Sequence, residues 1–125
     1  MLGLWLPESK KTEFERYFCD VRKITRKNRK TLFSKWEGRC FYTGQKLVTN
    51  EEFSKMNPGL SHARNPMRPT IDHKISLIRG FKDGISPEVL GGIDNLCICS
   101  QRVNSQKNYR TMIEFTKEEI QNVQG

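Results

Sequence analysis

The sequence predicts a small α+β domain, and three features of its hydrophobic pattern carry this prediction. An apolar stripe at helical spacing follows residue 13, two short apolar segments of strand type lie at 70–75 and 96–99, and another helical segment follows Ser100. The length of 125 residues fits one domain over 1–125. The hydrophobic fraction of 35% indicates a modest core, to which 7 Phe, 3 Tyr and 2 Trp contribute.

A helix is expected over roughly residues 13–28. Its apolar residues recur at helical spacing: Phe14, Phe18, Val21 and Ile24. Thr12 with Glu15 three positions later has the form of a capping box. Residues 32–36 predict a second helical turn or a continuation that ends before Gly38. The aromatic stripe could be core or a base-stacking platform, and its spacing favours the core.

The middle of the chain is expected to alternate strands and loops. Residues 40–43 predict a short strand that turns at Gly44, and the Pro-containing segment 50–69 predicts a long surface loop. Residues 70–75 predict a strand, followed by a Gly-rich loop over 80–92.

The last third begins with a buried strand at 96–99. Ser100 is placed to cap a helix that runs through Tyr109. Thr116 and Glu119 form another capping-box pattern, which predicts a separate short helix over 113–125.

Positive charge is concentrated in the first part of the chain. The net charge is +8, and six of the nine residues from 22 to 30 are Lys or Arg. Such a run binds a polyanion by releasing its counterions, although it also occurs on solvated helix faces. Nothing acidic nearby balances it, which favours nucleic acid. The expected binding residues of the run are Arg22, Lys23, Arg26, Lys27, Arg29 and Lys30.

Several protein classes conflict with the composition. No stretch reaches the 18 apolar residues of a membrane span, so no membrane partner is expected. The opening residues 1–7 are apolar but short, end at Pro7 and lack a basic region before them, so they do not match a signal peptide. The 4 cysteines do not form a secreted disulfide pattern. We therefore expect an intracellular, cytoplasmic protein.

Few residues in the sequence are candidates for catalysis or metal binding. The chain has 2 His, and His73 follows Asp72 at the end of an expected strand, while His62 lies in the Pro-containing loop. An Asp-His pair can bind a cation and transfer a proton, although a structural histidine at a strand end is the commoner case. Asn95 and Asn104 add amide groups that can orient an imidazole or ligate a hard ion.

Four fragments in this order resemble the HNH (ββα-metal) nuclease family. They are residues 38–44 (GRCFYTG), 71–75 (IDHKI), 93–96 (IDNL) and 103–108 (VNSQKN). The resemblance spans about residues 32–110. It implies an HNH core at 37–112, preceded by a basic helical part at 1–36 and followed by the helix at 113–125.

The resemblance implies a one-metal phosphodiesterase. His73 resembles the general base that activates water, and Asn95 resembles the middle motif residue that holds the strand-loop geometry and orients His73. Asp72 and Asn104 resemble the metal ligands, and such oxygen donors suit Mg²⁺ or Mn²⁺. Family members leave 5′-phosphate and 3′-hydroxyl ends.

Further cations flank these motifs. Lys107 matches the family's lysine after the third motif residue, and Lys74 and Arg110 lie near the motifs in sequence. All three are candidates for phosphate contact, as are Arg64, Arg68 and Arg79, with ordinary solvated charge as the alternative.

The chain departs from relatives that hold a structural zinc with two Cys-x-x-Cys pairs. Thr43, Ser100 and Val103 stand at three of the four ligand positions and supply no thiolate, so no structural zinc is expected. A rebuilt site from Cys19, Cys40, Cys97 and Cys99 is the alternative to small buried thiols.

Together these observations predict a divalent-metal-dependent DNA endonuclease that nicks or cuts DNA, of the kind encoded by phages or mobile elements and active in a bacterial or phage-infected host. The alternative is a catalytically inactive HNH-fold protein or another basic nucleic-acid-binding protein. Strand number, target specificity and assembly, including a homodimer or a larger complex, stay open.

Overall fold

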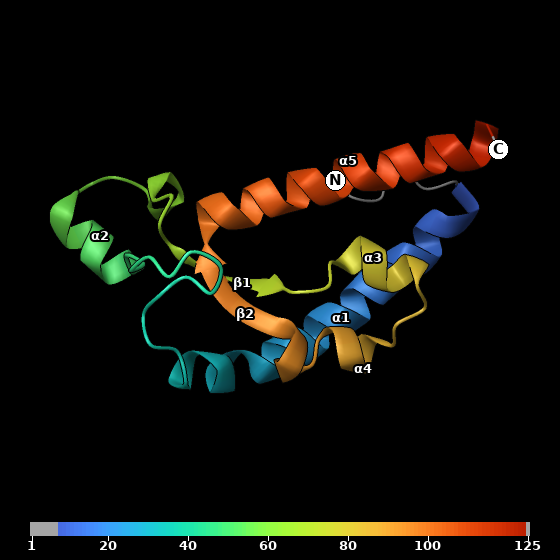
Figure 1. Cartoon of the computed structure of the whole chain (residues 1–125). Helices are drawn as coiled ribbons and strands as arrows, with labels where there is room; N and C mark the ends of the chain where they lie inside the picture. The colour runs from blue at the N-terminus through green and yellow to red at the C-terminus, as the bar shows by residue number, and fades with distance from the viewer. Residues whose placement is uncertain (1–7, 125) are drawn as a thin grey trace.

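The computed structural model describes residues 8–124 and has an α+β fold, with helices around one two-stranded antiparallel sheet (Figure 1). β1 (Pro69–His73) and β2 (Leu96–Ser100) form the sheet, and the long helices α1 (Glu8–Ser34) and α5 (Gln101–Gln124) both pack against it. The connections contain α2 (Asn50–Met56), α3 (Leu77–Lys82), α4 (Pro87–Leu90) and the 3-10 helices η2 (His62–Arg64) and η3 (Ile93–Asn95). The predicted α+β class is confirmed. The opening residues 1–7 and Gly125 lie outside the described residues.

α1 is one continuous helix of 27 residues, about 40 Å long. It begins at Glu8, so Thr12 lies inside it and the predicted capping box is wrong. Residues 8–11 contain no helix breaker, and the helix extends upstream through them. Phe14 and Val21 are buried, which places the predicted stripe in the core.

The sheet lies where the sequence predicted its strands. β1 and β2 pair antiparallel with Ile71 opposite Ile98 and Asp72 opposite Cys97. All five residues of β2 are buried. Ser100 Oγ accepts the Val103 amide proton at 3.1 Å, so the predicted cap of the following helix is confirmed.

The predicted strand at residues 40–43 is wrong, because this segment is a turn. The Gly44 amide donates to the Cys40 carbonyl at 2.9 Å, and Gly44 has φ of +72°, which a residue with a side chain rarely adopts. Phe41 N–H donates to Ile98 O at 2.9 Å, so the turn is attached to the middle of β2.

The two expected loops contain helices that capping side chains start. Thr49 and Glu52 form a capping box at α2, inside the predicted loop 50–69. Ser76 and Ser86 cap α3 and α4, which occupy the predicted Gly-rich loop 80–92. Both loop predictions are therefore wrong in part, since glycine and proline obscured short capped helices.

α5 runs without a break past the expected boundary at residue 113. Thr116 Oγ1 donates to the Met112 carbonyl at 2.9 Å, which is the bond of a threonine inside a helix. The separate C-terminal helix is a wrong prediction. Two ion pairs tie this part of α5 to α3, from Arg79 and Lys82 to Glu118 at 2.6 and 3.0 Å.

α1 is fixed against the segment between the strands. The Asn28 amide donates to Gly91 O at 2.9 Å, and a Cβ at Gly91 would lie 2.8 Å from the Val21 carbonyl oxygen. Only glycine permits this approach. The contact places the middle of α1 beside the end of β1. None of the helices described for residues 8–124 is both long and apolar enough to cross a membrane.

Candidate functional site

Asp72 and His73 are neighbours in the sequence but lie on opposite faces of β1. Side chains alternate along a strand, so Thr70 and Asp72 share one face and Ile71 and His73 share the other. The first face contacts α5, where the Asn104 amide donates to Thr70 Oγ1 at 3.2 Å. The second face contacts α1 through Thr25. The pair that the sequence predicted as one site therefore serves two environments.

Three donors surround the Asp72 carboxylate: Tyr42, Lys107 and Cys97. Asp72 is 4% exposed, and its Oδ2 accepts from the Tyr42 hydroxyl at 2.6 Å and lies 3.2 Å from Lys107 Nζ. Lys107 Nζ also lies 3.3 Å from Oδ1 and donates to the His73 carbonyl at 2.7 Å. The ammonium group thus neutralises the buried carboxylate and ties α5 to the end of β1.

The groups around this carboxylate are protonated donors. Burial, followed by the hydrogen bond to Asp72, raises the pKa of Tyr42. Burial is also the main cause that raises the pKa of Cys97 to about 11, and its Sγ lies 3.7 Å from Asp72 Oδ2. The Cys99 thiol faces Thr70 on the same side, and burial raises its pKa to about 12. Cys97 and Cys99 are thus neutral thiols, as the small-thiol interpretation expects.

Thr25 determines which nitrogen of His73 carries the proton. Its hydroxyl group contacts the Val21 carbonyl at 2.8 Å and His73 Nε2 at 2.9 Å. A hydroxyl has one proton, and the Val21 carbonyl can only accept it, so Thr25 must accept from Nε2–H. In the neutral ring the lone pair then lies on Nδ1. This is the protonation pattern that a general base requires.

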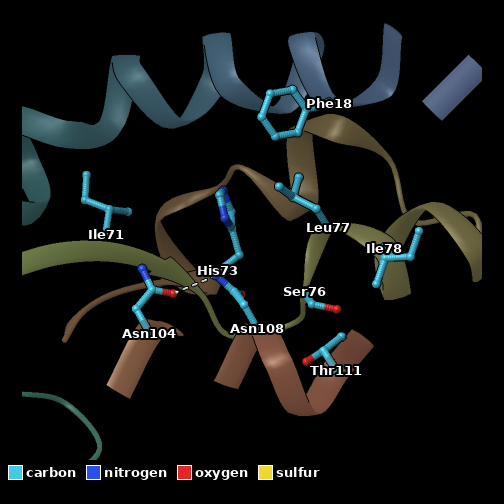
Figure 2. A pocket seen from close by; sticks show the side chains of 9 residues that line it. All are labelled: Phe18, Ile71, His73, Ser76, Leu77, Ile78, Asn104, Asn108 and Thr111. Atoms are coloured by element: carbon cyan, nitrogen blue, oxygen red, sulfur yellow. Dashed lines mark hydrogen bonds between the residues drawn. The ribbon is translucent and has the colours of Figure 1, made fainter. Parts of the chain in front are cut away.

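His73 borders a cavity of about 220 Å³ (Figure 2). Phe18, Leu77 and Ile78 supply apolar walls, while Asn104 and Asn108 enter from α5. Burial lowers the pKa of His73, Asp72 opposes this shift and Lys107 reinforces it. The imidazole is therefore neutral at pH 7.

Asn104 shares the cavity with His73, whereas Asp72 does not line it. The Asn104 amide donates to Thr70, and its oxygen accepts from Asn108 at 3.4 Å (Figure 2). Carboxylate and amide oxygens are the donor types that Mg²⁺ prefers. The chemistry of Asp72 and Asn104 therefore fits a hard divalent ion, and the Asp72 position already holds a cation. A metal ion at Asp72 would have to replace Lys107.

Asn95 connects the segments that follow β1 and precede β2. Its side-chain oxygen accepts from Ile75 N–H at 2.8 Å, and its amide donates to the Leu90 and Ile75 carbonyls at 2.7 and 3.3 Å. The Lys74 amide donates to the Asn95 carbonyl at 2.7 Å. Asn95 thus holds the strand-loop geometry beside His73 and is bound to backbone groups.

The candidate nucleic-acid-binding residues do not share one surface. Arg22, Arg26 and Arg29 line a cleft beside β1. Lys74 Nζ lies 3.2 Å from the Asp94 carbonyl and 4.8 Å from the Phe41 ring centre. Lys107 forms an ion pair with Asp72. Arg110 is exposed on α5, and Lys23, Lys27 and Lys30 are exposed on α1.

The remaining sequence candidates lie elsewhere. His62 is exposed and its Nε2 is 2.7 Å from Ser54 Oγ. Cys19 is exposed on α1, whereas Cys40, Cys97 and Cys99 are buried. Within residues 8–124, no group of three or more His, Cys, Asp or Glu side chains is arranged to hold a metal ion.

Sequence reasoning missed two residues of this site, Thr25 and Tyr42. Thr25 continues the spacing of Phe14, Phe18 and Val21 by four residues, so a polar residue on the buried face of a helix was the available signal. Tyr42 lay inside a matched motif, but its role depends on the turn that carries it to Asp72.

No family model, curated protein or solved structure matches this chain.

Proposed function

We propose that this chain is an HNH-type nuclease that hydrolyses DNA phosphodiester bonds with His73 as general base. One observation carries the proposal: the His73 imidazole, held at Nε2 by Thr25, borders a cavity next to an arginine-lined cleft. The order of two antiparallel strands followed by a helix also supports an HNH core over residues 37–112.

The chemistry follows from the positions of the side chains. His73 Nδ1 takes a proton from a water molecule whose oxygen attacks phosphorus. The bond from phosphorus to the 3′ oxygen breaks, and that oxygen takes a proton from solvent, which leaves 5′-phosphate and 3′-hydroxyl ends. Asn95 keeps the end of β1 in place during this step.

In this proposal Asp72 and Asn104 would hold Mg²⁺ or Mn²⁺, whose charge supports the phosphate and the leaving oxygen when the ion is bound. The second candidate function is a basic nucleic-acid-binding protein without catalysis. The Lys107–Asp72 ion pair favours it, because an ammonium group occupies the carboxylate that the metal requires.

The test incubates supercoiled plasmid with the full chain in Mg²⁺, Mn²⁺ or EDTA. We expect conversion to open-circle or linear DNA that EDTA abolishes. His73→Ala should reduce the cleavage rate by 10²–10⁴-fold, as is typical for loss of a general base, with little change in DNA binding.

His62→Ala is the matched control, since it removes an exposed histidine outside the cavity and should cleave like the unchanged chain. DNA binding without cleavage in any metal would contradict the nuclease and support the binding protein. Equal cleavage by His73→Ala and the unchanged chain would remove His73 from the mechanism.

A further inference from the structure

A cleft of about 510 Å³ lies between α1, the start of α2 and β1. Four arginines line it, three from α1 and one from the residue before β1: Arg22, Arg26, Arg29 and Arg68. Thr25, Asn50 and Thr70 add neutral hydrogen-bonding groups to its wall. The cleft therefore combines concentrated positive charge with neutral polar side chains.

The basic run of α1 divides into two faces. Arg22, Arg26 and Arg29 follow the spacing i, i+4, i+7, which places them on one side of the helix, and all three line the cleft. The three lysines of the run have the same spacing one residue further on, so they project about 100° around the helix. The lining of the cleft includes none of the three: Lys23, Lys27 and Lys30.

No carboxylate within residues 8–124 forms an ion pair with the four cleft arginines. Arg29 instead lies 4.9 Å from the Phe33 ring centre, and Arg68 comes from a different element. Four like charges around one cleft repel each other unless an anion enters. Guanidinium groups bind phosphate oxygens in pairs, so phosphate is the anion that this arrangement fits best.

The spacing of the arginines suits a phosphodiester backbone. From Arg22 to Arg29 the helix advances seven residues, about 10 Å at 1.5 Å per residue. This length lets the three arginines contact more than one phosphate of the same strand.

The cleft adjoins the hollows that His73 borders, because they share lining residues. Arg22 and Thr25 line the cleft and also a hollow of about 140 Å³ that His73 and Leu77 border. Ile71 lines both the cleft and the His73 cavity. A backbone bound along the arginines therefore leads toward the imidazole.

We propose that this cleft binds the phosphodiester backbone of one DNA strand and directs it to His73, and that the arginine face of α1, not its lysine face, makes the contacts. The direction toward His73 rests on the proposed nuclease function. Strand binding in the cleft does not depend on cleavage.

The experiment compares two triple variants of the full chain that remove equal charge from the same helix. One is Arg22→Gln/Arg26→Gln/Arg29→Gln, and the other is Lys23→Gln/Lys27→Gln/Lys30→Gln. Binding of a fluorescein-labelled single-stranded oligodeoxynucleotide is measured by anisotropy in EDTA at several salt concentrations. Glutamine keeps helix propensity, and circular dichroism checks that both variants fold.

The arginine variant should lower the slope of log affinity against log salt by about two units, at about 0.7 per lost single-strand phosphate contact. The lysine variant should lower it by less than one unit. Arg68→Gln should lower it by about 0.7, which corresponds to one lost contact. Equal slopes for the two triple variants would overturn the proposal, because binding would then follow net charge alone.

Arg29 contacts Phe33, so the double variants Arg22→Gln/Arg26→Gln and Lys23→Gln/Lys27→Gln repeat the comparison without it. The two proposals fail separately. A difference between the faces with no plasmid cleavage would support strand binding in the cleft and contradict the nuclease. Plasmid cleavage with no difference between the faces would support the nuclease and contradict strand binding by the arginine face.

Discussion

The two faces of β1 place the side chains of adjacent residues in different surroundings. On the α5 face, Asp72 is enclosed by Lys107, Tyr42 and Cys97 in a buried cluster. On the α1 face, His73 keeps one hydrogen bond to Thr25 and borders a cavity. Each polar group on the first face satisfies another, whereas the second face leaves an imidazole nitrogen available.

This difference gives the two residues of one dipeptide different requirements. A buried carboxylate requires a cation, and Lys107 supplies it from α5. A neutral imidazole has no such requirement and can border an open space. Variants on one face should therefore leave the other face unchanged.

The largest effect is expected on the Asp72 face. Lys107→Met leaves the buried carboxylate without its cation, and breaking a buried pair costs about 3–5 kcal/mol of unfolding free energy. Mn²⁺ should stabilise this variant more than the unchanged chain, because the ammonium no longer competes for Asp72. Chemical denaturation with and without Mn²⁺ measures both effects.

Two further variants make this test decisive. Lys74→Met removes an exposed lysine and should cost less than about 1 kcal/mol, with no added response to Mn²⁺. Asp72→Asn/Lys107→Met removes both charges and should recover much of the lost stability while losing the Mn²⁺ response. An equal Mn²⁺ response in all variants would place the metal away from Asp72.

A smaller effect is expected from Thr25 on the other face. Thr25→Val keeps the shape but removes the acceptor for His73 Nε2–H, so the ring proton can move to Nδ1. One net hydrogen bond is worth about 1 kcal/mol, which changes the ratio of the two ring tautomers about fivefold, so cleavage should fall by at most about that factor. Nitrogen NMR of the ring should show the Nε2–H form in the unchanged chain and a mixture in Thr25→Val.

Thr25→Ser retains the hydroxyl and should restore both the tautomer and the cleavage rate. The Asp72 face should not respond, so Thr25→Val should show the Mn²⁺ response of the unchanged chain. The same ring tautomer in Thr25→Val and the unchanged chain would show that Thr25 does not control the proton.

The smallest effect is expected from pH. Burial lowers the pKa of His73 in the folded state below that of the unfolded chain, so below about pH 6.5 the unfolded state binds more protons. The contribution of His73 to stability is therefore full above that pH and decreases as pH falls through the folded-state value. The acid limb of the cleavage rate should likewise lie below pH 6.5.

Denaturation midpoints from pH 7.5 to 5.5 measure this contribution as the difference between the unchanged chain and His73→Gln. His62→Gln should retain the pH dependence of the unchanged chain. A His73→Gln variant with the same pH dependence as the unchanged chain would contradict the burial of the imidazole.

Local patterns were reliable where one residue type decides the backbone. The apolar run of 96–99 and the serine at 100 predicted β2 and the start of α5, since both signals act within a few residues. The same local rules failed at Thr12 and Thr116, because a capping-box pattern inside a longer helix has no free amide groups to cap. Short helices α3 and α4 were hidden because glycines near them suggested only loops.

The candidate site shows the same limit. The sequence singled out Asp72, His73, Asn95 and Asn104, but it assigned the first two to one site, as metal ligand and general base. Strand alternation alone implied opposite faces, yet which helix covers each face depends on the packing of α1 and α5. The partners Thr25 and Tyr42 lie 48 and 30 residues from the side chains that they contact, beyond any local pattern.

By itself, the sequence determined the α+β class, the two strands, the cap of α5 and the position of the basic run, because each depends on neighbouring residues and on period. Only the tertiary structure decided that Arg22, Arg26 and Arg29 face a cleft while Lys107 neutralises Asp72. The sequence does not show which way a charged side chain points, because this depends on how packing turns each helix face toward a neighbour or toward solvent. That orientation is set by contacts such as that of Gly91 with Val21, which join segments distant in the chain.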